Sequence, residues 1–129
     1  MTDTAGKKIL IVDDEPDVVS YLKAFFEDNG FSVVTNASNG REGFEKALSE
    51  KPDLITLDIT MPEESGVKAF KDLQGNDATK MIPVIIITGV ALEFKKFIST
   101  RKSVDPPVAY FEKPIDRDEV LAKINEILG

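Results

Sequence analysis

The feature that most constrains the fold of this chain is a regular alternation of short apolar runs with amphipathic segments. The apolar runs have the length of strands and lie at residues 9–12, 31–34, 54–57, 84–87 and 108–111. Most of them are continuously apolar, which is typical of strands in a parallel sheet covered on both faces. Apolar residues recur at helical spacing around residues 18–26, 44–48, 64–73, 92–98 and 120–128.

The residues that flank these segments agree with alternating strands and helices. Pro16 is placed to open the first helix, because proline is tolerated at the first helical position, and Asn29-Gly30 is placed to close it. We therefore predict an α/β fold in which five helices cover a doubly wound parallel sheet of five strands. The chain of 129 residues shows no linker or internal repeat, so we expect a short tail at residues 1–7 and one domain at residues 8–129.

Composition excludes several classes of function. The chain has no cysteine and no histidine, which excludes a disulfide framework, a Cys/His zinc site and a Ser/His or Cys/His hydrolase. A net charge of −7 and a pI near 4.6 disfavour direct binding to nucleic acid. No apolar run approaches the roughly 20 residues that span a bilayer, and no signal peptide is evident. We expect a cytoplasmic protein without a membrane partner.

Chemically active side chains follow four of the five apolar runs. Asp13 and Asp14 follow the first run, Asp58 follows the third, Thr88 follows the fourth, and Lys113 comes shortly after the fifth. In an open parallel sheet these positions are the carboxyl ends of strands, which share one edge where ligands bind. We therefore expect these residues, which are distant in the sequence, to meet in one crevice.

Three carboxylates in one crevice would require a cation. They repel each other and oppose folding unless positive charge joins them, and oxygen ligands without His or Cys favour Mg²⁺. Taken alone, Asp13-Asp14-Glu15 also fits an acidic helix N-terminus that binds no metal. Asp58 favours the metal site, because an acid directly after a strand has no capping role to explain it.

Four segments together resemble the receiver domain of bacterial two-component response regulators, and the resemblance extends from Lys8 to Leu128. The segments are residues 9–16 (ILIVDDEP), 53–62 (DLITLDITMP, with Gly66 eight residues beyond Asp58), 85–89 (IIITG) and 110–114 (YFEKP). The resemblance implies a flavodoxin-like sheet with strand order 2-1-3-4-5. It also implies that Asp58 accepts a phosphoryl group, and that Asp13, Asp14, Asp58 and the backbone carbonyl of Thr60 hold Mg²⁺.

The resemblance assigns roles to three further residues. Lys113 would contact the phosphoryl group, and Thr88 would hydrogen-bond one of its oxygens. Tyr110 would move inward as an aromatic switch, although an aromatic residue on the last strand also fits a purely structural core position. The Lys113-Pro114 bond is usually cis in this family, but the sequence leaves the isomer open.

The implied phosphoryl donor is a phosphohistidine of a partner protein, either a histidine kinase or a phosphotransfer protein, because this chain has no histidine. The signal would pass to a downstream protein partner or an output domain. Such a domain is not an enzyme in the ordinary sense, but it assists its own phosphorylation and its slow dephosphorylation. In this family the side chain two residues beyond the threonine flanks the water that attacks the acyl phosphate. Here that residue is Val90, which offers no polar group, so the resemblance implies slow loss of the phosphoryl group.

Rival functions fit the residues less well. A haloacid-dehalogenase-like phosphatase would need a second Asp two residues after Asp58, where Thr60 stands. A flavodoxin-like cofactor site would need Ser, Thr and Gly in the first loop, where acids stand. A degenerate receiver that binds partners without phosphorylation is the remaining alternative, and the complete acidic set argues against it. A stand-alone receiver and the N-terminal receiver of a longer regulator both fit the sequence.

Two features depart from the commonest pattern of this family. Gly89 follows Thr88 where a small alanine is frequent, and the stretch from Thr88 to Lys113 is a few residues long. The extra length is expected near residues 103–107, beside a face that many receivers use for output. The mode of partner binding is therefore left open.

Overall fold

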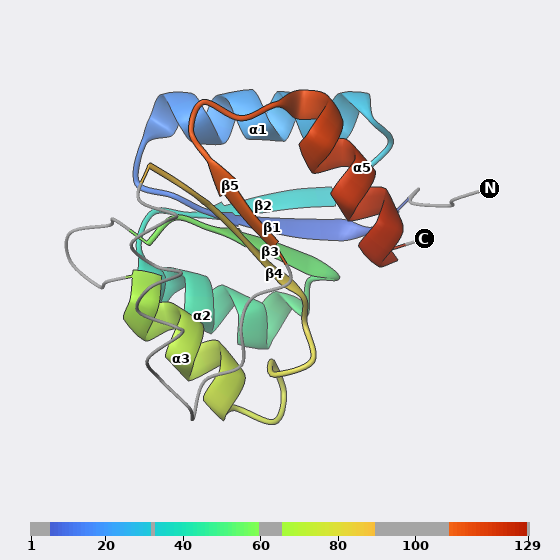
Figure 1. Cartoon of the computed structure of the whole chain (residues 1–129). Coiled ribbons are helices and arrows are strands. Elements are labelled where there is room, and N and C mark those ends of the chain that lie inside the picture. Colours follow the sequence, from blue (N-terminus) through green and yellow to red (C-terminus); the bar gives the residue numbers. More distant parts are fainter. Residues whose placement is uncertain (1–5, 32, 60–65, 90–108, 129) are drawn as a thin grey trace.

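The computed structural model describes residues 6–31, 33–59, 66–89 and 109–128, which form a five-stranded parallel sheet with helices on both faces (Figure 1). The strand order is β2-β1-β3-β4-β5, which confirms the expected topology. Helices α1 and α5 cover one face, and α2 and α3 cover the other. The elements are β1 (Lys8–Val12), α1 (Pro16–Asp28), β2 (Val33–Ala37), α2 (Gly40–Glu50), β3 (Leu54–Leu57), α3 (Gly66–Gly75), β4 (Val84–Thr88), β5 (Ala109–Glu112) and α5 (Arg117–Leu128). The helix expected at residues 92–98 and the extra length near residues 103–107 lie outside the described residues.

Each face of the sheet has its own apolar core. Along β1, Ile9 and Ile11 belong to the core that α1 and α5 cover, whereas Leu10 and Val12 belong to the core that α2 and α3 cover. All four side chains are buried, with exposed fractions between 0% and 2%. The continuous apolar runs in the sequence therefore reflect a sheet that is covered on both faces.

The second strand differs from the sequence prediction. The apolar run indicated residues 31–34, but β2 spans Val33–Ala37. Phe31 precedes the strand and packs against Phe26 of α1, with the ring centroids 5.9 Å apart. β2 is the outermost strand beside β1, so it can include the exposed polar residue Asn36. An apolar run is a poor guide to such an edge strand, because backbone pairing rather than burial defines its bounds.

The bounds of α1 agree with the sequence prediction. Pro16 is its first residue and Asn29 caps its end, followed by Gly30 at a φ of +96°, a conformation that favours glycine. α1 therefore starts directly after the loop that holds Asp13 and Asp14. Within the described ranges, no helix combines the length and the apolar character needed to cross a bilayer.

The strand ladder positions the residues that follow it. β1, β3, β4 and β5 are neighbours in the sheet. The backbone N–H of Asp58 donates to the carbonyl oxygen of Val12 at 3.0 Å, and that of Lys113 donates to the carbonyl oxygen of Thr88 at 3.1 Å. These bonds continue the ladder past the last residues of β3 and β5. They therefore fix the backbone positions of Asp58 and Lys113 at the carboxyl edge of the sheet.

Two buried threonines in this fold differ in whether their hydroxyls are hydrogen-bonded. Thr56 is 2% exposed and pairs with Ile11 and Ile85 in the centre of the sheet, and within the described residues its hydroxyl has no hydrogen-bond partner. The hydroxyl of Thr79 donates to the carbonyl oxygen of Leu73 at 2.6 Å. The same substitution should therefore have opposite effects at the two sites.

We expect Thr56→Val to raise the free energy of unfolding by about 1 kcal/mol, because it removes an unpaired buried hydroxyl. Thr79→Val should lower that free energy by about 1–2 kcal/mol, because the carbonyl of Leu73 loses its donor. Urea denaturation followed by circular dichroism measures both. A loss of stability in Thr56→Val as large as that in Thr79→Val would contradict this account of the core.

Candidate functional site

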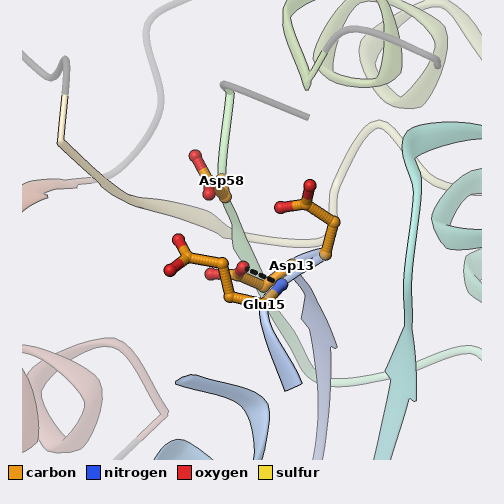
Figure 2. Close-up of side chains that lie close together, drawn as sticks. Asp13, Glu15 and Asp58 are labelled. Carbon is orange, nitrogen blue, oxygen red and sulfur yellow. Dashed lines mark hydrogen bonds between the residues drawn. The ribbon is translucent and has the colours of Figure 1, made fainter. Parts of the chain in front are cut away.

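Lys113 joins three carboxylates at the carboxyl edge of the sheet. Its Nζ atom lies 3.0 Å from Asp13 Oδ2, 3.1 Å from Asp58 Oδ2 and 2.8 Å from Glu15 Oε1. Asp13, Glu15 and Asp58 gather where β1 and β3 end (Figure 2). Lys113 follows β5, so its ammonium connects the end of β5 to acids that follow β1 and β3.

The two carboxylate oxygens of Asp58 have different partners. Oδ2 accepts from the Lys113 ammonium, and Oδ1 accepts a hydrogen bond from Thr88 Oγ1 at 2.8 Å. Asp58 is 1% exposed and Thr88 is 0% exposed. These two contacts orient both oxygens of Asp58, and a group attached to this carboxylate would be close to an ammonium and a hydroxyl. The Lys113-Pro114 peptide bond, whose isomer the sequence left open, is cis.

Burial and neighbouring charges shift the ionisation of the cluster. Burial raises the pKa of Asp13, while the backbone N–H of Glu15 and the ammonium of Lys113 act to lower it, and the charge of Asp58 raises it further. Burial acts to lower the pKa of Lys113, but the contacts with Glu15, Asp13 and Asp58 outweigh burial and hold that pKa above its ordinary value. Lys113 is therefore an ammonium at neutral pH.

The acidic residues are arranged in a way that fits a cation. Carboxylate oxygens of Asp13, Asp14, Glu15 and Asp58 lie within 4.8 Å of one another. Asp13 and Asp58 are buried, whereas Asp14 and Glu15 are exposed, so the group is accessible from solvent. Donors that are all oxygen suit Mg²⁺, which keeps waters or phosphate oxygens in its other positions. Thr60, the other expected ligand, lies outside the described residues.

Glu15 belongs to this site, although the sequence did not indicate it. Its carboxylate contacts Lys113, and its backbone N–H donates to Asp13 Oδ1 at 2.9 Å. This local bond from a residue to the aspartate two positions before it is a tight turn, which bends the chain back toward Asp13. No local pattern could have indicated this contact, because it depends on where the end of β5 places Lys113.

Tyr110 of β5 lies on the side of the sheet that α2 and α3 cover. It pairs with Ile86 of β4, and its half-buried ring packs against the core on that side. Burial raises the pKa of its hydroxyl above the ordinary value. The role of Tyr110 as a switch stays a prediction. Val90, which the sequence linked to slow loss of the phosphoryl group, lies outside the described residues.

Comparison with known proteins identifies close similarity over almost the whole chain. Residues 9–125 match the family described as response regulator receiver domain. The chain is 38% identical to PilH of Pseudomonas aeruginosa over 95% of this chain and 98% of PilH. It is also 38% identical to the alkaline phosphatase synthesis transcriptional regulatory protein PhoP of Bacillus subtilis, but it spans only 49% of that protein. A solved structure of the chemotaxis protein CheY4 of Vibrio cholerae matches 96% of this chain and 100% of that one, with a TM-score of 0.80 and 25% identity.

We expect Lys113→Met to lower the free energy of unfolding by about 3 kcal/mol in metal-free buffer, because the buried carboxylates of Asp13 and Asp58 lose their counter-ion. Added Mg²⁺ should then stabilise this variant more than the wild-type protein, since the ion replaces the lost positive charge. Chemical denaturation with EDTA and with Mg²⁺ measures both effects.

A lysine on the surface provides the matched control for this substitution. Lys68 Nζ lies 3.5 Å from Asp72 Oδ2, and the lysine side chain is 63% exposed. Lys68→Met should cost at most about 0.5 kcal/mol, because exposed ion pairs contribute little. Equal losses in Lys68→Met and Lys113→Met would mean that the cluster does not depend on its ammonium.

Proposed function

Since the chain belongs to the response regulator receiver domain family, we propose that it carries a signal as a phosphoryl group on Asp58. The observation that carries this proposal is the environment of that carboxylate, with Lys113 at one oxygen and Thr88 at the other. An ammonium and a hydroxyl are suitable donors to the oxygens of a phosphoryl group. Receiver domains are signalling domains, and this one would assist its own phosphorylation and slow dephosphorylation.

The proposed donor is a phosphohistidine on a histidine kinase or a phosphotransfer protein. A carboxylate oxygen of Asp58 attacks the phosphorus in line, the P–N bond to the imidazole breaks, and the product is an acyl phosphate. The imidazole leaves with the electron pair of that bond and takes a proton. During transfer, Lys113 would neutralise charge on the phosphoryl oxygens and Thr88 would donate a hydrogen bond to one of them.

The proposed metal ligands are Asp13, Asp14, Asp58 and the backbone carbonyl of Thr60. When bound, Mg²⁺ would neutralise further negative charge on the phosphoryl oxygens. The carboxylate oxygens within 4.8 Å of one another support this assignment. Asp13 is already engaged, because Oδ1 accepts a backbone N–H at 2.9 Å and Oδ2 accepts from Lys113. Asp14 is exposed and is therefore the freer carboxylate to bind the ion directly.

Thr88 and Tyr110 are proposed to convert phosphorylation into a change of the partner-binding surface. A phosphoryl group on Asp58 would offer Thr88 a more highly charged acceptor than the carboxylate oxygen to which it now donates. Movement of Thr88 toward that acceptor would change the space beside β4, where Tyr110 packs, and Tyr110 would turn inward. A downstream protein partner or an output domain would bind the altered surface.

The proposed organisation is a receiver domain at residues 8–129 that acts in the cytoplasm, without direct contact to nucleic acid or membrane. Its partners would be a histidine kinase or phosphotransfer protein and a downstream protein. A phosphorylation-independent interaction module is less favoured, because such a module has no need of the buried contacts that Asp58 makes with Lys113 and Thr88.

We expect phosphoramidate with Mg²⁺ to add one phosphoryl group to the wild-type protein, and Asp58→Asn to abolish this labelling, because the amide is a poor nucleophile. Asp53→Asn is the matched control. Asp53 lies at the opposite end of β3, where its carboxylate accepts the backbone N–H of Lys8 at 2.9 Å. Mass spectrometry of the intact proteins decides, and stoichiometric labelling of Asp58→Asn would refute the assignment.

We also expect Asp14→Ala to weaken Mg²⁺ binding by at least about tenfold, which corresponds to roughly 1.4 kcal/mol. Asp13→Ala should have a smaller effect, because Asp13 is already engaged by Lys113 and a backbone N–H. Calorimetric titration of both variants measures the two affinities. Equal losses, or a greater loss in Asp13→Ala, would mean that the roles of the two acids are misassigned.

A further inference from the structure

Gly66, the first residue of α3, lies directly against the backbone of Asp58. A Cβ atom built on Gly66 would lie 2.3 Å from the carbonyl oxygen of Asp58 and 2.3 Å from the Cα atom of Ile59. Real Cβ atoms essentially never approach other atoms so closely. The neighbours are backbone atoms, which cannot swing aside as the end of a flexible side chain can. Any side chain at this position would therefore displace either α3 or the Asp58–Ile59 segment.

The packing of α3 decides which of the two would move. Ala69, Phe70 and Leu73 of this helix are between 1% and 3% exposed and belong to the core that also contains Ile55 and Leu57 of β3. Close-packed cores resist displacement, because a shift of the helix opens space along the whole contact. The added atom would therefore push mainly on Asp58 and Ile59, which follow the end of β3.

Asp58 depends on short contacts that such a push would disturb. Its backbone N–H donates to Val12 at 3.0 Å, Oδ1 accepts from Thr88 at 2.8 Å, and Oδ2 accepts from Lys113 at 3.1 Å. A movement of about 1 Å at a reacting group can cost on the order of 10²-fold in rate. The orientation of the Asp58 carboxylate is therefore sensitive to what stands at residue 66.

We propose that Gly66 is a positioning residue for the phosphoacceptor. Because it has no side chain, α3 packs against the Asp58 backbone and holds the carboxylate against Lys113 and Thr88. This inference rests on the proposed function, since it assigns Gly66 to the phosphorylation of Asp58 rather than to stability alone.

Two other glycines provide controls. A Cβ atom on Gly43 of α2 would lie 2.8 Å from Cγ2 and 2.9 Å from Cγ1 of Val12, so Gly43→Ala also crowds a helix against the sheet, but it meets side-chain atoms. A Cβ atom on Gly75, at the other end of α3, would meet nothing within 4 Å. Gly43→Ala therefore controls for lost stability, and Gly75→Ala controls for alanine in the same helix.

The test compares phosphorylation by phosphoramidate and Mg²⁺ in the wild-type protein and the three variants, at a temperature where circular dichroism shows each to be folded. Gly66→Ala should be phosphorylated at least about tenfold more slowly than the wild-type protein. Gly43→Ala and Gly75→Ala should remain close to the wild-type rate. Calorimetric titration should also show weaker Mg²⁺ binding in Gly66→Ala only, which a loss of stability alone would not produce.

Several outcomes would overturn the proposal. A wild-type rate in Gly66→Ala would remove the positioning role and leave Asp58 as the acceptor. An equal loss of rate in Gly43→Ala would show that the site responds to any crowding of the core. Thr56→Val is expected to stabilise the fold and can be combined with Gly66→Ala. If the double variant still does not fold, Gly66 is needed for folding itself and the proposal fails. A wild-type protein that takes up no label would instead refute the proposed function, and this inference with it.

Discussion

The structure depends on one interaction, the contact of the Lys113 ammonium with the carboxylates of Asp13 and Asp58. Both acids are almost completely buried, with exposed fractions of 3% and 1%. Two negative charges so far from water would oppose folding without a positive partner, because their desolvation costs several kcal/mol each. Lys113 supplies that partner. Its ammonium also forms an ion pair with the carboxylate of Glu15, which is exposed to solvent.

The same contacts that stabilise the fold also prepare the site. Lys113 and Thr88 are joined through the backbone, and both contact the side chain of Asp58, so β3, β4 and β5 meet at one carboxylate. This arrangement follows from the strand order, in which β3 lies next to β4 and β4 next to β5. A group attached to Asp58 would therefore affect three strands at once, which is a physical basis for turning phosphorylation into a change at the surface.

Much of this structure could be predicted from the sequence, because burial and strand ends leave strong signals. Continuous apolar runs indicated a sheet covered on both faces, and the shared edge of parallel strands brought Asp58 and Lys113 together. The rest depends on contacts that have no local pattern. Phe31 is apolar because it packs against Phe26, not because it belongs to a strand. Glu15 reaches the site through a tight turn. The close approach of Gly66 to the Asp58 backbone appears only when α3 is packed on the sheet.

The central claim, that Asp58 is the acceptor, can be measured without any substitution. After treatment with phosphoramidate and Mg²⁺, borohydride reduces an acyl phosphate to an alcohol and converts a phosphorylated aspartate into homoserine. Peptide mapping by mass spectrometry then identifies the modified position. The account predicts homoserine in place of Asp58 and at no other aspartate. Homoserine at Asp13 or Asp14, with Asp58 unchanged, would contradict it.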